Sequence, residues 1–397
     1  MTREEIRNDI LGLKATSILA ELPTSAGKSR IAIEYINEKS IKGNILIVVP
    51  RLILFDNWKD EFVKWGYQDT LKQVTFTTYV SLPKHAGSNY NLIIYDECHH
   101  LSERARDAAN EIISDYKILL SATVTRPLKK EIKLLFPGIE CYKISLKEAI
   151  DENILPDPKV YLVPLQLDEK TIDQFFITGP KKVKNPTIVP FSSRFQAKRD
   201  KTHAYKVICT QAQYYEEASS MVDFYKRQYF RTNNQIIYFR WQKAAKDRLM
   251  WLSSLKNDVT KKILSSLKDK RTLTFCNSIE QTEILGKYCI NSKNDSSSKY
   301  LEEFNKGKIN HITSCNMLNE GCNLVNCQVG IFVSINSSEI MTTQKNGRLL
   351  RHSEPIIFII YYKNTREDEL VQEMINNYNP ELITVVENLE QLNEINN

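Results

Sequence analysis

The sequence of 397 residues has no hydrophobic run long enough to cross a membrane. Its longest apolar stretches, residues 45–49 and 356–362, are far shorter than the roughly 20 residues that span a bilayer. Residues 1–10 contain acidic side chains and no apolar signal segment. We therefore expect a soluble protein of the cytoplasm. Because the abundance of Ile, Asn and Lys is compatible with an AT-rich bacterial or phage genome, the host cytoplasm is the corresponding expectation for a phage protein.

The sequence also lacks paired cysteines of the Cys-x-x-Cys type. Cys322 and Cys327 have no second pair of ligands nearby at the spacing that zinc sites use. Free cysteines pack as small apolar residues in reducing compartments. The eight cysteines therefore predict buried free thiols.

The pattern of apolar residues indicates two similar halves with a different segment between them. Apolar residues make up 42% of the chain and charged residues 26%, which excludes a wholly disordered protein. Short β-rich runs alternate with amphipathic stretches from residue 15 to about 150 and again after residue 270, which predicts two α/β domains with parallel sheets. We expect domains at 1–154 and 271–397, joined by a linker and a mainly helical insertion at 155–270. Within that insertion, residues 159–167 predict a strand pair.

The net charge of +6 conceals an uneven distribution. Residues 171–270 contain 20 Lys and Arg against 8 Asp and Glu, whereas the remainder contains 34 against 40. The same segment contains 15 of the 38 aromatic residues. Basic side chains that neutralise phosphates and rings that stack on bases predict a nucleic-acid grip, with Lys181, Lys182 and Lys184 as contacts. The alternative is a helical insertion with an aromatic core and a solvated charged face.

A candidate phosphate-binding turn follows the predicted strand at residues 17–20. It ends in Gly27-Lys28-Ser29, directly before a predicted helix. Backbone N–H groups at such a helix start can bind phosphate, while Lys28 supplies a positive charge and the Ser29 hydroxyl can ligate Mg²⁺. The strict pattern requires glycine where this chain has Leu22, so an ordinary strand-turn-helix remains the alternative.

Two carboxylates follow the buried run at residues 92–95. In open parallel sheets, ligands bind at the carboxyl ends of the strands. We predict that Asp96 holds Mg²⁺ and that Glu97 is the general base for the attacking water in phosphoryl transfer. The alternative is an acidic pair that caps the next helix. Two adjacent histidines on one segment are expected to point apart, so the sequence argues against a zinc site at His99 and His100.

These motifs resemble those of superfamily 2 helicases of the DExH type. Residues 22–29, 96–99 and 120–123 resemble the Walker A, Walker B and Ser-Ala-Thr motifs, and residues 48–66 and 77–82 are similar to the strand-contacting motifs of the first RecA-like domain. Residues 274–279, 319–324 and 344–351 resemble motifs IV, V and VI. The sequences around these motifs are most similar to those of the excision-repair, UvsW-type and type III restriction motors, which act on DNA.

The resemblance implies two RecA-like domains with ATP and Mg²⁺ in the cleft between them. It further implies an ATP-dependent DNA helicase or translocase, with a monomer as the simplest state. The nucleotide would be held by Pro23, Thr24, Ser25, Ala26, Gly27, Lys28 and Ser29, with Glu320, Gly321 and Asn323 linking it to the bound strand. Mg²⁺ would be bound by Ser29 and Asp96. The catalytic residues would be Glu97, Gln344 and the arginine fingers Arg348 and Arg351. Coupling would use His99, Ser121 and Thr123, and nucleic acid would contact Pro50, Arg51, Thr78, Tyr79 and Ser278.

Two residues depart from the family pattern. Ser25 stands where the family usually has glycine, so a side-chain-bearing residue must adopt a backbone angle that suits glycine. Ile6 replaces the glutamine of the family's adenine-recognition segment, which weakens the expectation of adenine selectivity. Arg3 in that segment is a candidate base-stacking contact.

Other functions stay open at this point. An RNA helicase fits the same motifs, because backbone contacts do not separate DNA from RNA. A motor subunit of a restriction or nuclease complex would need a cutting partner, since the remaining sequence has no nuclease constellation. A clamp with a decayed motor is disfavoured by the joint presence of Lys28, Asp96, Glu97, Arg348 and Arg351.

Overall fold

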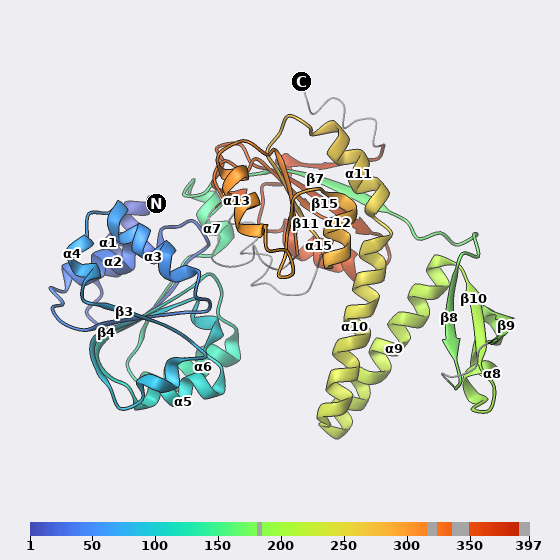
Figure 1. The fold of residues 1–397 in the computed structure, drawn as a ribbon, viewed down its shortest axis with the longest axis horizontal. Helices are drawn as coiled ribbons and strands as arrows, with labels where there is room; N and C mark the ends of the chain where they lie inside the picture. The colour runs from blue at the N-terminus through green and yellow to red at the C-terminus, as the bar shows by residue number, and fades with distance from the viewer. Residues whose placement is uncertain (181–184, 316–323, 336–348, 389–397) are drawn as a thin grey trace.

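The computed structural model describes residues 1–180, 185–315, 324–335 and 349–388 (Figure 1). Within them, no helix is both long enough and apolar enough to span a bilayer. Seven cysteines in these ranges are free thiols, and six of the seven are buried, as the sequence predicted. The chain forms two parallel sheets covered by helices and a separate insertion, which confirms the predicted fold class.

Domain 1 is built on a six-stranded parallel sheet in the order β3-β2-β4-β5-β1-β6. The strands are β1 (Ser17–Glu21), β2 (Ile45–Val49), β3 (Val74–Thr78), β4 (Asn89–Asp96), β5 (Ile113–Ser121) and β6 (Glu140–Lys143). The helices are α1 (Arg3–Gly12), α2 (Lys28–Glu38), α3 (Leu54–Lys64), α4 (Gln68–Leu71), α5 (Glu103–Glu111), α6 (Arg126–Leu135) and α7 (Leu146–Asp151). Strands β1 and β2 are completely buried because helices cover both faces of the sheet. All strands therefore end at one edge, where Glu21, Asp96 and Ser121 lie.

Domain 2 is built on a seven-stranded sheet in the order β12-β13-β11-β14-β15-β7-β16. The strands are β7 (Lys159–Leu165), β11 (Thr272–Phe275), β12 (Cys289–Ile290), β13 (His311–Ser314), β14 (Val329–Phe332), β15 (Ile356–Tyr362) and β16 (Ile383–Val385). The helices are α11 (Asn257–Ser266), α12 (Ile279–Leu285), α13 (Ser297–Asn305) and α15 (Arg366–Ile375).

Strand β7 corrects the predicted strand pair at residues 159–167. A single strand forms there, and it pairs in parallel with β15 and β16 inside the second sheet. Val160, Leu162 and Val163 are buried, so this run gains more from a place within a sheet than from an exposed hairpin. The insertion thus interrupts domain 2 after its first strand, and α11 packs on the same sheet.

The insertion contains a small sheet as well as the predicted helices. Strands β8 (Gln174–Thr178), β10 (Tyr205–Cys209) and β9 (Thr187–Pro190) form the sheet, with α8 (Arg194–Arg199) beside it. Helices α9 (Gln211–Thr232) and α10 (Gln235–Ser254) form a long antiparallel pair, which we call the hairpin, projecting from domain 2 (Figure 1). Residues 211–254 contain no glycine or proline, which permits two uninterrupted helices. The sheet was missed because its strands are short and border the proline-containing stretch.

Buried polar contacts fasten the base of the hairpin to domain 2. Lys256 is fully buried and its Nζ donates to the carbonyl oxygens of Val333 and Ile360 at 2.9 and 2.8 Å. The same Nζ forms a 2.6 Å ion pair with Glu367 Oε1. Buried Gln281 accepts from Ser253 Oγ at 2.9 Å and from the backbone N–H of Asn277 at 3.0 Å. The hairpin is therefore attached to the ends of β14 and β15 and to the loop after β11.

We expect Lys256→Met to reduce the free energy of unfolding by about 3–5 kcal/mol, because it leaves the Glu367 carboxylate buried without its partner. Urea unfolding followed by circular dichroism measures the change. The double variant Lys256→Met/Glu367→Gln removes the unpaired charge and should recover part of the loss. Equal losses in the single and double variants would contradict this explanation.

Candidate active site

The phosphate-loop residues lie in the turn between β1 and α2. Ser25 has φ 77° and Gly27 has φ 93°, so both lie in the left-handed region that suits glycine. Ser25 therefore adopts the angle that its departure from the family pattern predicted. Gly27 caps α2 without a side-chain hydrogen bond, which leaves the backbone N–H groups of the helix start available to an anion.

Leu22 is accommodated at the position where the strict pattern has glycine because the fold buries its side chain. Its side chain is fully buried in the core of domain 1, and its N–H donates to the carbonyl of Ser121 at 2.9 Å. The loop thus begins one residue after β1 ends and is tied to the end of β5. A bulky apolar residue at this point packs into the core and leaves the rest of the turn unobstructed.

Lys28 and the two carboxylates meet at the edge of the sheet. Lys28 Nζ lies 3.7 Å from Glu97 Oε1 and donates to the Leu22 carbonyl at 3.3 Å. Asp96 Oδ2 accepts from Trp58 Nε1 at 2.9 Å. Burial raises the pKa of the Asp96 carboxyl to about 6, and the negative charge of Glu97 adds to the rise. A divalent cation at this position would offset the cost of burying that charge.

Two buried oxygens in this site have no hydrogen-bond partner among the described residues: Thr24 Oγ1 in the loop and Glu97 Oε2. A buried polar atom left unpaired is costly unless a ligand or water satisfies it. The left-handed loop, the Lys28 ammonium, the orphaned hydroxyl and the paired carboxylates together fit a nucleotide triphosphate with Mg²⁺. Ser29, in the first turn of α2, and Asp96 would hold the metal, which polarises the phosphate oxygens when bound.

A chain of polar contacts leads from Glu97 to the end of β5. Glu97 has φ 51°, and its Oε2 lies 3.4 Å from His99 Nδ1. His99 Nδ1 also lies 3.0 Å from Ser121 Oγ, which donates to the carbonyl of Thr123 at 2.9 Å. The three predicted coupling residues are therefore connected in one row.

Domain 2 reaches the phosphate loop through Arg351. Its Nε donates to Ser25 Oγ at 2.9 Å, across 326 positions of sequence. The other predicted residues of motif VI, Gln344 and Arg348, lie outside the described residues, as do Glu320, Gly321 and Asn323 of motif V. Arg351 thus carries the observed contact between the second domain and the candidate nucleotide site.

The segment that resembles the adenine-recognition motif begins α1. Ile6 is fully buried in the core of domain 1, so this position offers no polar group to adenine. Arg3 donates from Nη2 to the carbonyl of Ile154 at 3.1 Å, which ties α1 to the linker between the domains. Base stacking by Arg3 stays a prediction.

Predicted nucleic-acid contacts follow the ends of β2 and β3. Arg51 is exposed there, and Pro50 and Tyr79 line a cavity of about 230 Å³ together with His100. The Tyr79 side chain is only 6% exposed and its hydroxyl donates to the Asp96 carbonyl at 2.7 Å, and its contact with nucleic acid stays a prediction. The Thr78 side chain is likewise buried. The hydroxyl of Tyr79 thus stabilises the strand end that carries the carboxylates.

The remaining predicted contacts lie elsewhere. Ser278 caps α12 by accepting from Gln281 N–H at 3.1 Å. Lys181, Lys182 and Lys184 lie outside the described residues. Trp58, which bonds Asp96, and Gln281, which anchors the hairpin, were not predicted, because contacts between segments 38 and 28 residues apart leave no local pattern.

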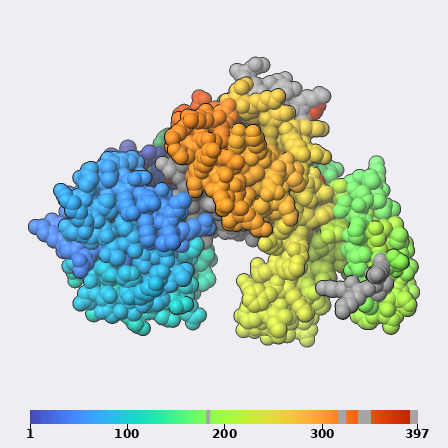
Figure 2. Space-filling model, viewed as in Figure 1, coloured from blue at the N-terminus to red at the C-terminus, as the bar shows by residue number. Residues whose placement is uncertain are grey.

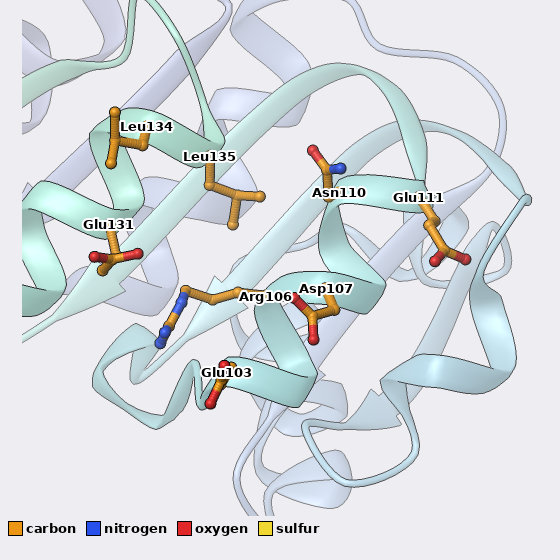
Figure 3. A pocket seen from close by; sticks show the side chains of 8 residues that line it. All are labelled: Glu103, Arg106, Asp107, Asn110, Glu111, Glu131, Leu134 and Leu135. Atoms are coloured by element: carbon orange, nitrogen blue, oxygen red, sulfur yellow. The ribbon is translucent and has the colours of Figure 1, made fainter.

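A separate cavity of about 610 Å³ lies between α5 and α6 (Figure 3). Its lining includes Glu103, Asp107, Glu111 and Glu131, with Arg106 among them. Arg106 Nη1 donates to the carbonyl of Leu101 at 2.8 Å. The acidic lining is unsuited to a polyphosphate, which separates this cavity from the candidate active site.

Two family models match separate parts of this chain. Residues 3–126 match the family described as type III restriction enzyme, res subunit, and residues 255–353 match the helicase conserved C-terminal domain. The DNA 3'-5' translocase XPB2 of Sulfurisphaera tokodaii is 24% identical over 382 residues, covering 90% of this chain and 80% of that protein.

Two solved structures share the fold. S. cerevisiae Dbp5 bound to RNA and ADP BeF3 matches with a TM-score of 0.61 and 9% identity, covering 99% of this chain and 91% of that one. The Pyrococcus furiosus Hef helicase domain matches with a TM-score of 0.50 and 16% identity, covering 94% and 97%. These likenesses confirm the tandem arrangement of two parallel-sheet domains predicted from the sequence.

Proposed function

Because this chain belongs to the superfamily 2 helicases and translocases, we propose that it is an ATP-dependent DNA translocase or helicase whose ATPase is stimulated by the nucleic acid it moves along. The observation that carries the proposal is the hydrogen bond from Arg351 to Ser25. It brings a guanidinium of domain 2 to the phosphate loop of domain 1, so a complete site requires both domains. A site of this kind changes when the domains move relative to each other.

The chemistry divides among residues of domain 1 and Arg351. Lys28 and the N–H groups at the start of α2 hold the phosphates. Glu97 Oε2 is positioned to accept the proton of the attacking water, while Lys28 Nζ lies 3.7 Å from the other carboxylate oxygen, Oε1. Arg351 stabilises the charge that develops on the transferred phosphoryl group, with Arg348 as a second proposed finger and Gln344 as the proposed sensor of the attacking water.

Coupling to movement follows from two connections. The row Glu97, His99, Ser121 links the candidate base to the end of β5, and Thr123 continues it through its carbonyl. In domain 2, Lys256 and Gln281 tie the hairpin to the sheet, so the hairpin moves with that domain. Glu320, Gly321 and Asn323 remain proposed links between nucleotide and strand.

The DNA track is proposed to pass between domain 1 and the hairpin. Figure 2 shows an open hollow there, beneath domain 2. Arg51 at the end of β2, the backbone at Thr78, Ser278 at the start of α12 and the lysines 181, 182 and 184 are the proposed contacts. The positive excess of residues 171–270 then lies on one side of the track.

DNA is preferred over RNA because XPB2, which is 24% identical over 382 residues, is named a DNA translocase. The RNA-bound Dbp5 likeness, at 9% identity, concerns the fold alone. A second candidate, the motor subunit of a restriction complex, is favoured by the family match over residues 3–126.

An ATPase assay with single-stranded, duplex and forked DNA and with RNA tests the proposal. We expect stimulation by DNA that Lys28→Ala abolishes, because the variant loses the charge that holds the phosphates. Absence of stimulation by any nucleic acid would refute a motor, and stimulation by RNA alone would replace DNA with RNA. Plasmid cleavage that appears only with an added nuclease subunit would favour the restriction candidate.

A further inference from the structure

The tip of the hairpin, residues 224–246, has a composition unlike the rest of the chain. Its 23 residues include seven aromatic residues, six Lys and Arg, and no Asp or Glu. Net positive charge without any acidic residue favours a polyanion. Abundant rings favour a partner with faces on which they can stack.

The aromatic residues of the tip divide into a packed set and an exposed set. Tyr229, Tyr238 and Trp241 pack across the two helices, with ring centroids 5.2 to 6.0 Å apart. Phe230 and Phe239 extend from this cluster and are 71% and 67% exposed. The packed set accounts for the stability of the tip, whereas burial of the two phenylalanines contributes little to folding.

The tip holds these side chains on a stiff support. Asn233 adopts φ 47° and ends α9, while the Asn234 side chain accepts from Ile236 N–H at 2.8 Å and caps α10. The turn thus comprises two residues with satisfied backbone groups. Arg231 and Arg240 flank the exposed rings, and neither has an acidic partner among the described residues.

We infer that the hairpin tip binds unpaired bases at a junction between duplex and single-stranded DNA, with Phe230 and Phe239 as stacking platforms and Arg231 and Arg240 on the phosphates. Bases in the interior of a duplex are stacked on both sides and expose no face to the tip, so exposed rings favour unpaired bases. The inference rests on the proposed function and deepens it, because it names forked or tailed DNA as the preferred substrate.

The position of the tip agrees with this role. The hairpin borders the hollow that we propose for the DNA track, and the tip is the end of the hairpin that lies farthest from domain 2 (Figures 1 and 2). Because Lys256 and Gln281 anchor the hairpin base, displacement of domain 2 displaces the tip by the same rigid connection. Each movement of domain 2 would therefore move the bases stacked on the tip relative to the duplex.

The test compares binding of tailed, blunt and single-stranded DNA by the full chain without ATP. A 2-aminopurine base at the junction reports stacking through its fluorescence. We expect Phe230→Ala/Phe239→Ala to weaken binding of tailed and single-stranded DNA by at least about 10-fold, with little change for blunt duplex. Phe230→Trp/Phe239→Trp should keep the binding and the fluorescence change.

Two further variants separate the contributions. Phe195→Ala removes another exposed phenylalanine, 60% exposed on α8, and should leave binding unchanged. Arg231→Gln/Arg240→Gln should lower the slope of log affinity against log salt for single strands by about 1.4. Circular dichroism checks that all variants fold. We expect them to fold because the replaced rings are exposed.

The outcomes distinguish this inference from the proposed function. If DNA binding without ATP depends on Phe230 and Phe239, the inference about the tip is supported even when no nucleic acid stimulates the ATPase. Absence of stimulation would refute only the proposed motor. Equal binding of tailed DNA by the alanine variant and the original chain would overturn the inference. Two other results would also overturn it. If Phe230→Ala/Phe239→Ala weakened binding to anionic lipid vesicles and not to DNA, the tip would bind a membrane. If the same variant lowered the mass of the protein in solution and left DNA binding unchanged, the tip would bind a second copy of this chain.

Discussion

Replacement of Glu97 by Gln is expected to slow ATP hydrolysis by about 10²–10⁴-fold while ATP still binds. Gln preserves the size of the side chain and the φ of 51° that Glu97 adopts, but its amide cannot accept a proton from water. The affected atom is Oε2, which is buried and lacks a hydrogen-bond partner among the described residues. Single-turnover hydrolysis measures the chemical step, and binding of a fluorescent ATP analogue measures affinity.

Glu103→Gln is the matched control for this variant. Glu103 is an exposed acid of α5, six positions further along the chain and at the separate cavity. Its neutralisation should leave hydrolysis unchanged. A Glu97→Gln variant that binds ATP and hydrolyses it at the original rate would remove Glu97 from the catalytic role and leave it as a structural partner of Lys28.

Arg351→Ala is expected to lower the rate of hydrolysis by about 10³-fold or more, because a guanidinium that neutralises charge in the transition state of phosphoryl transfer has effects of that order. ATP binding should change far less, since Lys28 and the loop supply most of the ground-state contacts. Arg351→Lys should not restore the rate, because an ammonium lacks the planar fork of donors. The same two measurements apply.

Ser25→Ala tests whether Arg351 acts through the phosphoryl group or only as a latch between domains. The substitution removes the hydroxyl that accepts from Arg351 Nε at 2.9 Å and keeps a side chain with a Cβ at the strained position. A finger predicts a small effect, because the guanidinium remains available to the substrate. Losses of equal size in Ser25→Ala and Arg351→Ala would show that the contact itself is what matters.

Local patterns predicted the parts of the site that lie on one segment. The phosphate loop was recognisable because a turn that presents N–H groups needs Gly27, Lys28 and Ser29 in succession. The carboxylates were recognisable because Asp96 and Glu97 directly follow a buried strand, and the carboxyl ends of parallel strands meet at one edge. The alternation of strands and helices likewise predicted two α/β domains.

Segments brought together from distant parts of the chain were not predictable in the same way. Residues 159–167 predicted a strand pair, but nothing local shows that a single strand forms there and pairs with residues 356–362 and 383–385. Tyr79 resembles a strand-contacting residue by position, yet tertiary packing buries its ring and turns the hydroxyl to Asp96. An aromatic core was one of the two interpretations of residues 171–270, and only the fold separates packed Trp241 from exposed Phe230.

The sequence by itself therefore determined which residues could carry the proposed chemistry: a candidate phosphate loop, two strand-end carboxylates proposed for Mg²⁺ and for the attacking water, and a concentration of positive charge between two α/β domains. The tertiary structure decided how these parts cooperate, by placing Arg351 beside Ser25 and by fixing the hairpin to domain 2 through Lys256. The physical reason is the separation along the chain of the residues that interact. Turn geometry and strand-end chemistry depend on residues a few positions apart, whereas a site shared by two domains depends on the burial of surfaces hundreds of residues apart.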